Sequence, residues 1–441
     1  MNYLQHLLNS KGKANLPGRA LQICRRFGLT SRKITKDLHF LLEIARRYGR
    51  EPTIFLTADI LDREGDLIRR VSENGAQFGV HGNYHIDFAS LSPDSQSKAI
   101  AAAVDKFRKH GVPVNGFRSP FLRYNDDTAR AVKQNGLSWA SHSVMFIQPG
   151  TWIQRIHASK RAQNLINGFY VQEPHEKTPS LPSWGQHCLQ IPVSLPDDEL
   201  LVDRLAIREP NEIATVWTDM LNITNANGEL LNLLLHPERR SIVAESLEAL
   251  LQHAAHTPGL WTAPLNDIAR WWQERAAFTF TIDQISSISH RITPLCTPRA
   301  AVLIQEPGGT RRTANLSNDG SFSLNSSLRP TIHMPLDFCD RQTPCLANEG
   351  FVVERDSDPS TCSFALTGTC ARNVRSLLAG LNGAKGPLVT YGRWPKPYAS
   401  ALCFSIDLDA FTLLDFVRRL GHFTAARRMS DSYVATQWTS Q

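Results

Sequence analysis

The chain has 441 residues, of which 42% are hydrophobic and 20% are charged, and its formal net charge at pH 7 is +7. This length predicts two or three domains, and the absence of any run of about 18 apolar residues excludes a membrane-spanning helix. The start "MNYLQHLLNSKGKANLPGR" has no apolar signal-peptide core, so we expect a cytoplasmic protein. The basic residues are scattered rather than gathered in an aromatic-laced stripe, which argues against a nucleic-acid partner.

Residues 34–140 repeat one local pattern, in which an amphipathic helix is followed by a glycine and then by a short apolar strand. Strands such as "PTIFLTA" and "AQFGV" alternate with helices such as "ITKDLHFLLEIARRYG". Each expected helix ends at a glycine, where a left-handed cap costs little: Gly49, Gly75, Gly111 and Gly136. Ser92 and Pro93 are typical of a helix N-cap and first turn. This alternation predicts an α/β fold with parallel strands, either a sheet or a barrel.

Functional residues of such folds lie at the carboxyl ends of the strands. "HGNYH" and "RSPF" each follow a predicted strand directly. Residues 141–185 are irregular, and "CLQIPVSLPDDE" then predicts a strand. "EPNEIATVWTDMLNITNANG" is predicted to be helical, "ELLNLLLH" a buried strand, and "AESLEALLQHAAHTPG" another helix. With "APLNDIARWWQERAA", the α/β domain is expected to occupy residues 1–276.

Residues 277–370 alternate apolar and polar side chains between turn residues, which predicts a small antiparallel β-sandwich-like domain. Four cysteines in this part lack the C-x2-C spacing of a zinc site, so we expect unpaired thiols: Cys339, Cys345, Cys362 and Cys370. Residues 371–441 are expected to form a connecting helix and then "ASALCFSIDLDAFTLLDFVRRLG", a strand that runs into a helix with Asp407 and Asp409 at the junction.

His81 and His85 are spaced as metal ligands can be, although 15 histidines in 441 residues give about 0.5 such pairs by chance. The spacing alone is therefore weak evidence for a metal site. The position of the two histidines directly after a predicted strand strengthens it. His253 and His256 lie within a predicted helix, and we expect them to be a solvated helix end.

These motifs together resemble the polysaccharide deacetylase family (NodB-homology, carbohydrate esterase 4-like) over residues 34–275. The resemblance implies a distorted (β/α) barrel and a metal-dependent hydrolase that removes acetyl or related acyl groups from amino sugars. By position, it implies metal ligation by His81 and His85, and a general-acid role for His236. Arg118 would hold a catalytic aspartate. Substrate contacts would come from four residues, namely Tyr84, Pro120, Phe121 and Leu234.

One departure from the family concerns its opening strand, which ends in two aspartates before the helix that here begins at Ile34. The sequence there is "LQICRRFGLTSRK", and Arg25 and Arg26 cannot replace carboxylates as ligand or base. "ALCFSIDLDA" near the C-terminus resembles that opening motif. We therefore expect a circular permutation, in which the strand at 401–406 pairs beside "PTIFLTA". The alternative is that Asp409 caps the following helix.

In the permuted arrangement, Asp407 would be the general base and Asp409 the third metal ligand. Two histidines and one carboxylate suit a divalent ion, zinc first, with cobalt, nickel or iron also possible. The family often has an aspartate that tunes the acid histidine, but the nearest residue here is Ala140. The expected function is a metal-dependent deacylase of an N-acylated sugar or glycan precursor. Alternatives are another C–N hydrolase acting on ureides or formamides, and a non-catalytic glycan-binding protein.

Overall fold

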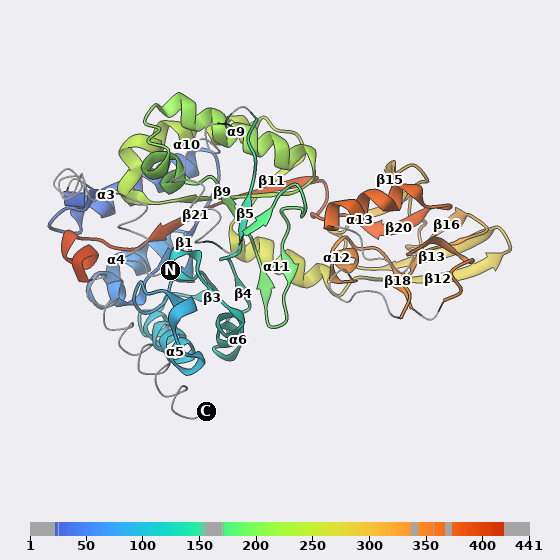
Figure 1. Cartoon of the computed structure of the whole chain (residues 1–441), viewed down its shortest axis with the longest axis horizontal. Coiled ribbons are helices and arrows are strands. Elements are labelled where there is room, and N and C mark those ends of the chain that lie inside the picture. The colour runs from blue at the N-terminus through green and yellow to red at the C-terminus, as the bar shows by residue number, and fades with distance from the viewer. Residues whose placement is uncertain are drawn as a thin grey trace.

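The computed structural model describes residues 23–418 except 25, 151, 153, 155–169, 171, 337–342, 356 and 367–372, and the structural statements below refer to this part of the chain. Figure 1 shows a larger α/β part and a smaller β-rich part, with helix α11 (Leu265–Arg275) between them. Within the described residues, no helix is both long enough and apolar enough to cross a membrane.

The larger part is built on one curled sheet of twelve strands, in the order β6-β5-β9-β10-β21-β1-β2-β3-β4-β8-β7, with β11 paired to β21 off this path. The strands are β1 (Thr53–Leu56), β2 (Gln77–Val80), β3 (Val114–Phe117), β4 (Trp139–Ala140), β5 (Val144–Phe146), β6 (Gln172–Pro174), β7 (Ser183–Trp184), β8 (Leu189–Gln190), β9 (Val193–Leu195), β10 (Leu230–Leu235), β11 (Leu260–Thr262) and β21 (Ser400–Leu408). All pair in parallel except β7 with β8. This is the distorted α/β barrel that the sequence predicts, open between β6 and β7.

Strand β21 comes from the C-terminal part of the chain but lies in the middle of the sheet. It pairs in parallel with β1, where Thr53 faces Ser405, and with β10, where Leu230 faces Ala401. All nine of its residues are buried, as its apolar sequence requires. The predicted pairing beside "PTIFLTA" is confirmed, and the strand is three residues longer than the expected 401–406.

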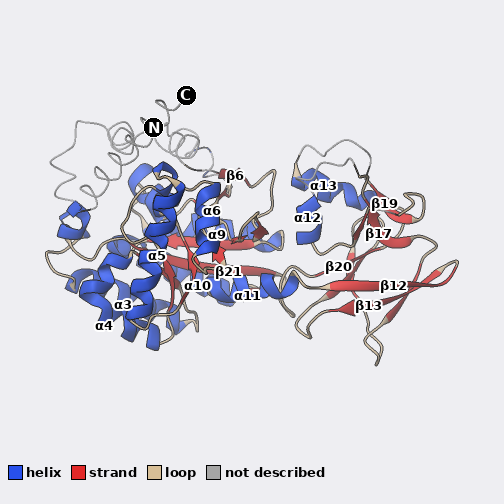
Figure 2. Cartoon of the chain, turned by 90° about the horizontal axis from the view of Figure 1, so that it is seen from below, coloured by secondary structure: helices blue, strands red, loops and turns tan. Residues whose placement is uncertain are grey.

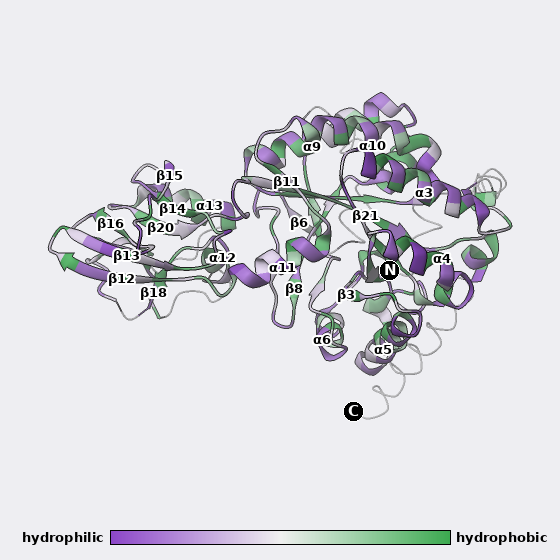
Figure 3. Cartoon of the chain, turned by 180° about the vertical axis from the view of Figure 1, so that it is seen from behind, coloured by the Kyte–Doolittle hydropathy of each residue, from purple (hydrophilic) through white to green (hydrophobic). Residues whose placement is uncertain are grey.

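Helices of the described residues cover the sheet, and Figure 2 shows them in blue around the red strands. They are α3 (Arg32–Arg47), α4 (Leu61–Glu73), α5 (Pro93–Lys109), α6 (Asp126–Gln134), α9 (Pro210–Ala226), α10 (Arg240–Ala255) and α11 (Leu265–Arg275). Hydrophobic and hydrophilic residues alternate along α9 and α10 in Figure 3, which is typical of helices that bury one face. The four predicted glycine ends all have positive φ, and Ser92 caps α5 through its side chain, with Pro93 in the first turn.

The described residues of the smaller part form three three-stranded sheets, ordered β12-β13-β16, β15-β14-β20 and β18-β17-β19. The elements are β12 (Thr279–Ser286), β13 (Ser289–Leu295), β14 (Val302–Gln305), β15 (Arg311–Thr313), β16 (Phe322–Asn325), β17 (Arg329–His333), α12 (Thr343–Asn348), β18 (Val353–Glu354), β19 (Cys362–Ala365), α13 (Val374–Gly380) and β20 (Leu388–Tyr391).

Two features of this part differ from the sequence-based expectation. The third sheet is parallel rather than antiparallel, because both neighbours of β17 run in its direction. Strand β20 pairs with β14, so the β region continues past residue 370 to Tyr391. Short strands carry no local signal of their direction, since alternation is the same in both kinds of ladder. Cys362 is a buried free thiol, whereas Cys339, Cys370 and also Arg25 lie outside the described residues.

Candidate metal centre and active site

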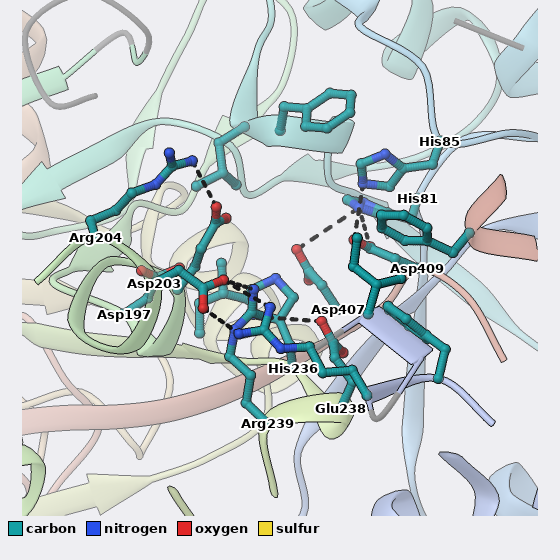
Figure 4. A pocket seen from close by; sticks show the side chains of 18 of the residues that line it. His81, His85, Asp197, Asp203, Arg204, His236, Glu238, Arg239, Asp407 and Asp409 are labelled. Atoms are coloured by element: carbon teal, nitrogen blue, oxygen red, sulfur yellow. Dashed lines mark hydrogen bonds and ion pairs between the residues drawn. The ribbon is translucent and has the colours of Figure 1, made fainter. Parts of the chain in front are cut away.

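The polar residues singled out in the sequence meet at the carboxyl edge of the barrel strands. His81 and His85 follow β2, Arg118 follows β3, and His236 follows β10. Asp407 is near the end of β21, and Asp409 follows it. Parallel strands bring their carboxyl ends to the same edge of a sheet, so residues from both ends of the chain become neighbours. Five of these side chains line one cavity of about 110 Å³: His81, His85, His236, Asp407 and Asp409 (Figure 4).

Three side chains of this cavity converge as a possible metal-binding group. His81 Nε2 is 3.3 Å from Asp409 Oδ1, and His85 Nε2 is 3.2 Å from Asp409 Oδ2. The ligand atoms of the three residues all lie within 4.8 Å of one another. Two ligand atoms bound at about 2.1 Å to a tetrahedral ion are about 3.4 Å apart, so the spacing fits a single ion.

The tautomer of His81 also fits metal binding. Its Nδ1 is 2.8 Å from the carbonyl oxygen of Arg118, an acceptor, so Nδ1 carries the proton. Nε2 therefore presents its lone pair towards Asp409 and His85. Metal-bound histidines generally donate their second ring nitrogen to a carbonyl or carboxylate in this way. The donor set of His81, His85 and Asp409 thus suits a divalent transition metal.

Arg118 organises the base of the cavity. It is fully buried, and its Nη1 donates to Asp407 Oδ1 at 2.8 Å and to Ser405 Oγ at 2.9 Å. Its Nε and Nη2 donate to the backbone carbonyl and the side-chain oxygen of Ser141, both at 2.9 Å. The guanidinium also lies over the ring of Phe55, with Cζ 4.0 Å from the centroid. A buried charge is tolerated when it is paired and hydrogen-bonded, as here.

The carboxylate of Asp407 occupies the middle of the cavity. Figure 4 shows its carboxylate between the His81–His85–Asp409 group and His236. One oxygen accepts from Arg118, and the other lies 3.9 Å from His81 Nε2. The carboxylate therefore faces the same space as the possible metal ligands without being needed in their group.

His236 is oriented by an aspartate that sequence reasoning missed. Asp198 Oδ1 lies 2.6 Å from His236 Nδ1, and Asp198 Oδ2 accepts the backbone N–H of His236 at 2.7 Å. Burial lowers the pKa of His236, but the Asp198 carboxylate outweighs it and raises the pKa to about 10. The ring is therefore protonated at neutral pH. The sequence has Ala140 where an aspartate was expected to tune the histidine, and Asp198, from the loop after β9, takes that place.

A second acidic group contains this histidine, but its chemistry does not suit a metal. Asp197, Asp198 and His236 also lie close enough together for their ligand atoms to share an ion. His236 Nδ1 is already engaged with Asp198, and a protonated ring offers no lone pair. Burial and the neighbouring Asp198 charge raise the pKa of Asp197 to about 7, which further weakens it as a ligand.

The predicted substrate-contacting residues are placed differently from one another. Phe121 lines the cavity, and its ring meets His85 edge-on with centroids 4.3 Å apart. Leu234 also lines it, whereas Tyr84 and Pro120 do not belong to the lining. Phe121 and Leu122 have φ values of 62° and 54°, which is uncommon for residues with side chains. Such strain occurs where the surrounding structure fixes a functional loop.

Side chains from both ends of the described part of the chain line this cavity. Phe27 and Phe416 line it, and their rings stack with centroids 5.2 Å apart. Arg26 lines it as well, and its guanidinium pairs with the Asp203 carboxylate. These contacts were not predicted, because the sequence separation of Phe27 and Phe416 leaves no local signal.

The alternative role of Asp409 as a helix cap is not observed. The last described helix runs over residues 413–418, and Thr412 Oγ1 accepts the backbone N–H of Asp415 at 3.1 Å. Asp415 Oδ2 in turn accepts the N–H of Thr412 at 3.0 Å, which completes a capping box. His253 and His256 are exposed at the end of α10, as expected for a solvated helix end.

Replacing Asp198 with asparagine is expected to lower the pKa of His236, because the anionic partner that raises it is removed. Protonated His236 then disappears at a lower pH, so the basic limb of kcat/KM should move down by about 1–3 pH units. A pH–rate profile measures this shift. Asp197→Asn is the matched control, since Asp197 bonds to the N–H of Leu200 and should move the limb less. An unchanged limb in Asp198→Asn would contradict the proposed tuning.

Comparison with known proteins agrees with part of this picture. Residues 36–140 match the family model for polysaccharide deacetylase. This match confirms the resemblance over the segment that holds His81, His85 and Arg118, and it ends before His236 and the C-terminal aspartates. No curated protein matches the sequence.

Solved structures with a similar arrangement have low sequence identity to this chain. A protein assigned to the polysaccharide deacetylases from Pseudomonas aeruginosa PAO1 is 19% identical, with a TM-score of 0.42, over 54% of this chain and 72% of its own. One from Mycobacterium smegmatis is 18% identical, with a TM-score of 0.41, over 53% of this chain and 76% of its own. The PuuE allantoinase is 18% identical, with a TM-score of 0.42, over 54% of this chain and 72% of its own.

Proposed function

We propose that this chain, whose residues 36–140 match the polysaccharide deacetylase family, is a metal-dependent hydrolase that removes an acetyl group from the nitrogen of an amino sugar or glycan precursor. The observation that carries the proposal is the meeting of Asp407 of β21 and Asp409, which follows β21, with His81, His85 and His236 in one cavity. Among the residues that line this cavity, the matched segment contributes two candidate metal ligands but no carboxylate, and the end of β21 and the residue after it supply Asp407 and Asp409.

We also propose that the barrel is circularly permuted. The family opens with the strand that carries its aspartates, and in this chain β21 provides a strand with the aspartates beside β1. Domain termini often lie near each other at the surface, so moving one strand from the start to the end of a chain is physically tolerable. The β region from 277 to Tyr391 would then separate the body of the barrel from its remaining strand.

The metal would be held by His81 Nε2, His85 Nε2 and Asp409, with zinc as the first choice and cobalt, nickel or iron as alternatives. A divalent ion at such a site lowers the pKa of a water molecule and polarises a carbonyl oxygen. Three protein ligands leave a position open for this chemistry.

Asp407 is the proposed general base. Arg118 holds its Oδ1, and its Oδ2 faces His81 across 3.9 Å, so one oxygen is positioned while the other can accept a proton from water. Arg118 and the groups bonded to it thereby fix the position of this carboxylate.

His236 is the proposed general acid. An amine is too basic to leave as an anion, so the amide nitrogen must receive a proton as the C–N bond breaks. The Asp198 carboxylate keeps His236 protonated at neutral pH and fixes Nδ1, so the proton to be donated is on Nε2. The two proposed proton carriers, Asp407 and His236, both line the cavity.

The size of the cavity supports acetyl rather than a long acyl chain. Its volume is about 110 Å³, well below the roughly 300–1,000 Å³ of pockets for drug-sized ligands. Phe27, Phe121, Leu234 and Phe416 supply its apolar walls, on which a methyl group can pack.

The proposal is tested by assaying the full chain, loaded with zinc or cobalt, on N-acetylglucosamine, on its tetramer and on a cyclic ureide. We expect acetate release from an N-acetyl substrate, loss of that release on chelation, and its return when the metal is restored. Acetate release that chelation does not affect would contradict the metal role. Turnover of the ureide alone would reassign the chain to a different C–N hydrolase.

A further inference from the structure

A second cavity, of about 380 Å³, lies between the barrel and the β region. Its lining comes from β7, from α11 and the start of β12, from the turn after α12, and from β20. The backbone N–H of Leu265, at the start of α11, donates to Thr53 Oγ1, so α11 begins beside the amino end of β1. The proposed metal ligands lie at the other edge of the sheet, after the carboxyl ends of the strands. The two cavities share no lining residue, so the second is a separate place on the molecule.

Six of the lining residues of the second cavity are aromatic: Trp184, Trp272, Phe278, Phe280, Phe351 and Tyr391. The rings of Phe280 and Tyr391 stack with centroids 4.2 Å apart and planes 19° from parallel. Tyr391 is fixed further because its hydroxyl donates to the Thr279 carbonyl at 2.5 Å. Trp184 is 40% exposed, which places it at the mouth. The aromatic wall is therefore ordered, and Trp184 is its solvent-exposed part.

Trp272 has a buried donor with no partner within the described part of the chain. Its side chain is 1% exposed, and its indole Nε1 makes no hydrogen bond there. The neighbouring buried indoles are satisfied, since Trp271 Nε1 donates to Arg393 O at 2.8 Å and Trp394 Nε1 donates to Gly228 O at 3.0 Å. Buried polar groups are almost always hydrogen-bonded, so the unpartnered N–H of this lining residue is a donor left over for a ligand in the cavity.

The charge of the second cavity favours a neutral ligand. Among the described residues that line it, Arg275 alone is charged. Backbone carbonyls occupy its guanidinium: Nε donates to Gly392 O at 2.9 Å, Nη1 to Asn348 O at 2.5 Å and Nη2 to Tyr391 O at 3.4 Å. Three of its five N–H groups are thus engaged within the protein, and no second charged side chain among the described lining residues would help to hold a phosphate or a carboxylate.

We propose that this second cavity binds one sugar residue of a glycan. A pyranose ring is neutral and has apolar C–H faces that pack on aromatic rings, and its oxygens can accept from Trp272 Nε1. Trp184 would cover one face of the ring at the mouth, while the deeper aromatic wall would contact the other parts. The site goes beyond the proposed hydrolase activity, because it needs neither the metal nor the residues of the first cavity.

The test is isothermal titration calorimetry of the full, metal-loaded chain with three neutral oligosaccharides: chitotetraose, cellotetraose and xylotetraose. At least one should bind, and its Kd should be unchanged in His81→Ala, which separates this site from the first cavity. Trp184→Ala should weaken binding by about tenfold, since a stacking face is lost. Trp272→Phe should weaken it by about fivefold while keeping the aromatic wall.

Tyr398→Ala is the matched control, since Tyr398 is an aromatic residue of similar exposure, 38%, that stacks on Trp261 outside this cavity. It should bind like the wild type. Unchanged affinity in both tryptophan variants would overturn the proposal, and so would the absence of binding by all three oligosaccharides. If binding is lost only in His81→Ala, the sugar occupies the first cavity and the proposal also fails. Thermal melting of each variant identifies any loss that comes from unfolding.

Discussion

Asp407→Asn is expected to lower kcat by about 10²–10⁴, the contribution of a general base, while the chain keeps its metal. The amide can still accept the Arg118 hydrogen bond through its oxygen, so the position of the side chain is preserved. It cannot take a proton from water at neutral pH. Steady-state kinetics and metal analysis of the same preparation measure the two effects separately.

A control for this variant is Asp415→Asn, the same exchange on the segment that follows β21. Asp415 caps the last described helix and pairs with Arg63 at 2.6 Å, outside the cavity lining. Its kcat should stay near the wild-type value. If Asp407→Asn lost its metal instead of its turnover, then Asp407 would be a ligand and the proposed roles of Asp407 and Asp409 would have to be exchanged.

Removal of residues 399–441 is expected to unfold the barrel rather than merely inactivate it. Strand β21 is paired on both sides, and four of its large apolar side chains are at most 1% exposed: Leu402, Phe404, Ile406 and Leu408. Burial of each contributes about 1.5–3 kcal/mol, so together they supply about 6–12 kcal/mol. A typical domain has a net stability of about 5–15 kcal/mol. A chain ending at 398 should therefore show no cooperative thermal transition of the barrel.

A milder version of this change keeps the experiment informative if the truncated chain aggregates. Phe404→Ala leaves the strand in place and should lower the free energy of unfolding by about 3–5 kcal/mol, measured by denaturant titration. A chain ending at 418 retains β21 and the helix capped by Thr412 and Asp415, so it should keep a cooperative transition of the barrel. A cooperative transition at the wild-type temperature in the 1–398 chain would show that β21 is dispensable for the barrel.

The central position of β21 also explains why the sequence could predict it. Its apolar run requires burial on both faces, which suits a central parallel strand and not an exposed appendage. The two aspartates at its end then fall at the edge of the sheet that already holds His81 and His85. The local sequence predicts both the buried strand and the aspartates at its end. The parallel pairing of the strands then brings these aspartates close to the two histidines.

The residues that sequence reasoning missed contact partners that are distant in the sequence, and no local pattern links such residues. Asp198 reaches His236 from 38 positions away, and it was not expected because the family places its tuning residue elsewhere. Ser141 and Ser405 hydrogen-bond to Arg118 inside the barrel, and a small polar residue in or beside a strand gives no sequence signal of such a bond. Phe27 and Phe416 meet only because the two ends of the described chain fold over the same cavity.

The central claim is that side chains from distant parts of the sequence form one metal centre, and its most direct test is the metal content of purified protein. Inductively coupled plasma mass spectrometry should find about one divalent transition metal ion per wild-type chain. His81→Ala, His85→Ala and Asp409→Asn should each lose the metal while keeping the circular dichroism spectrum of the wild type. His253→Ala, at an exposed helix end, should keep it. Full metal occupancy in all three ligand variants would contradict the account.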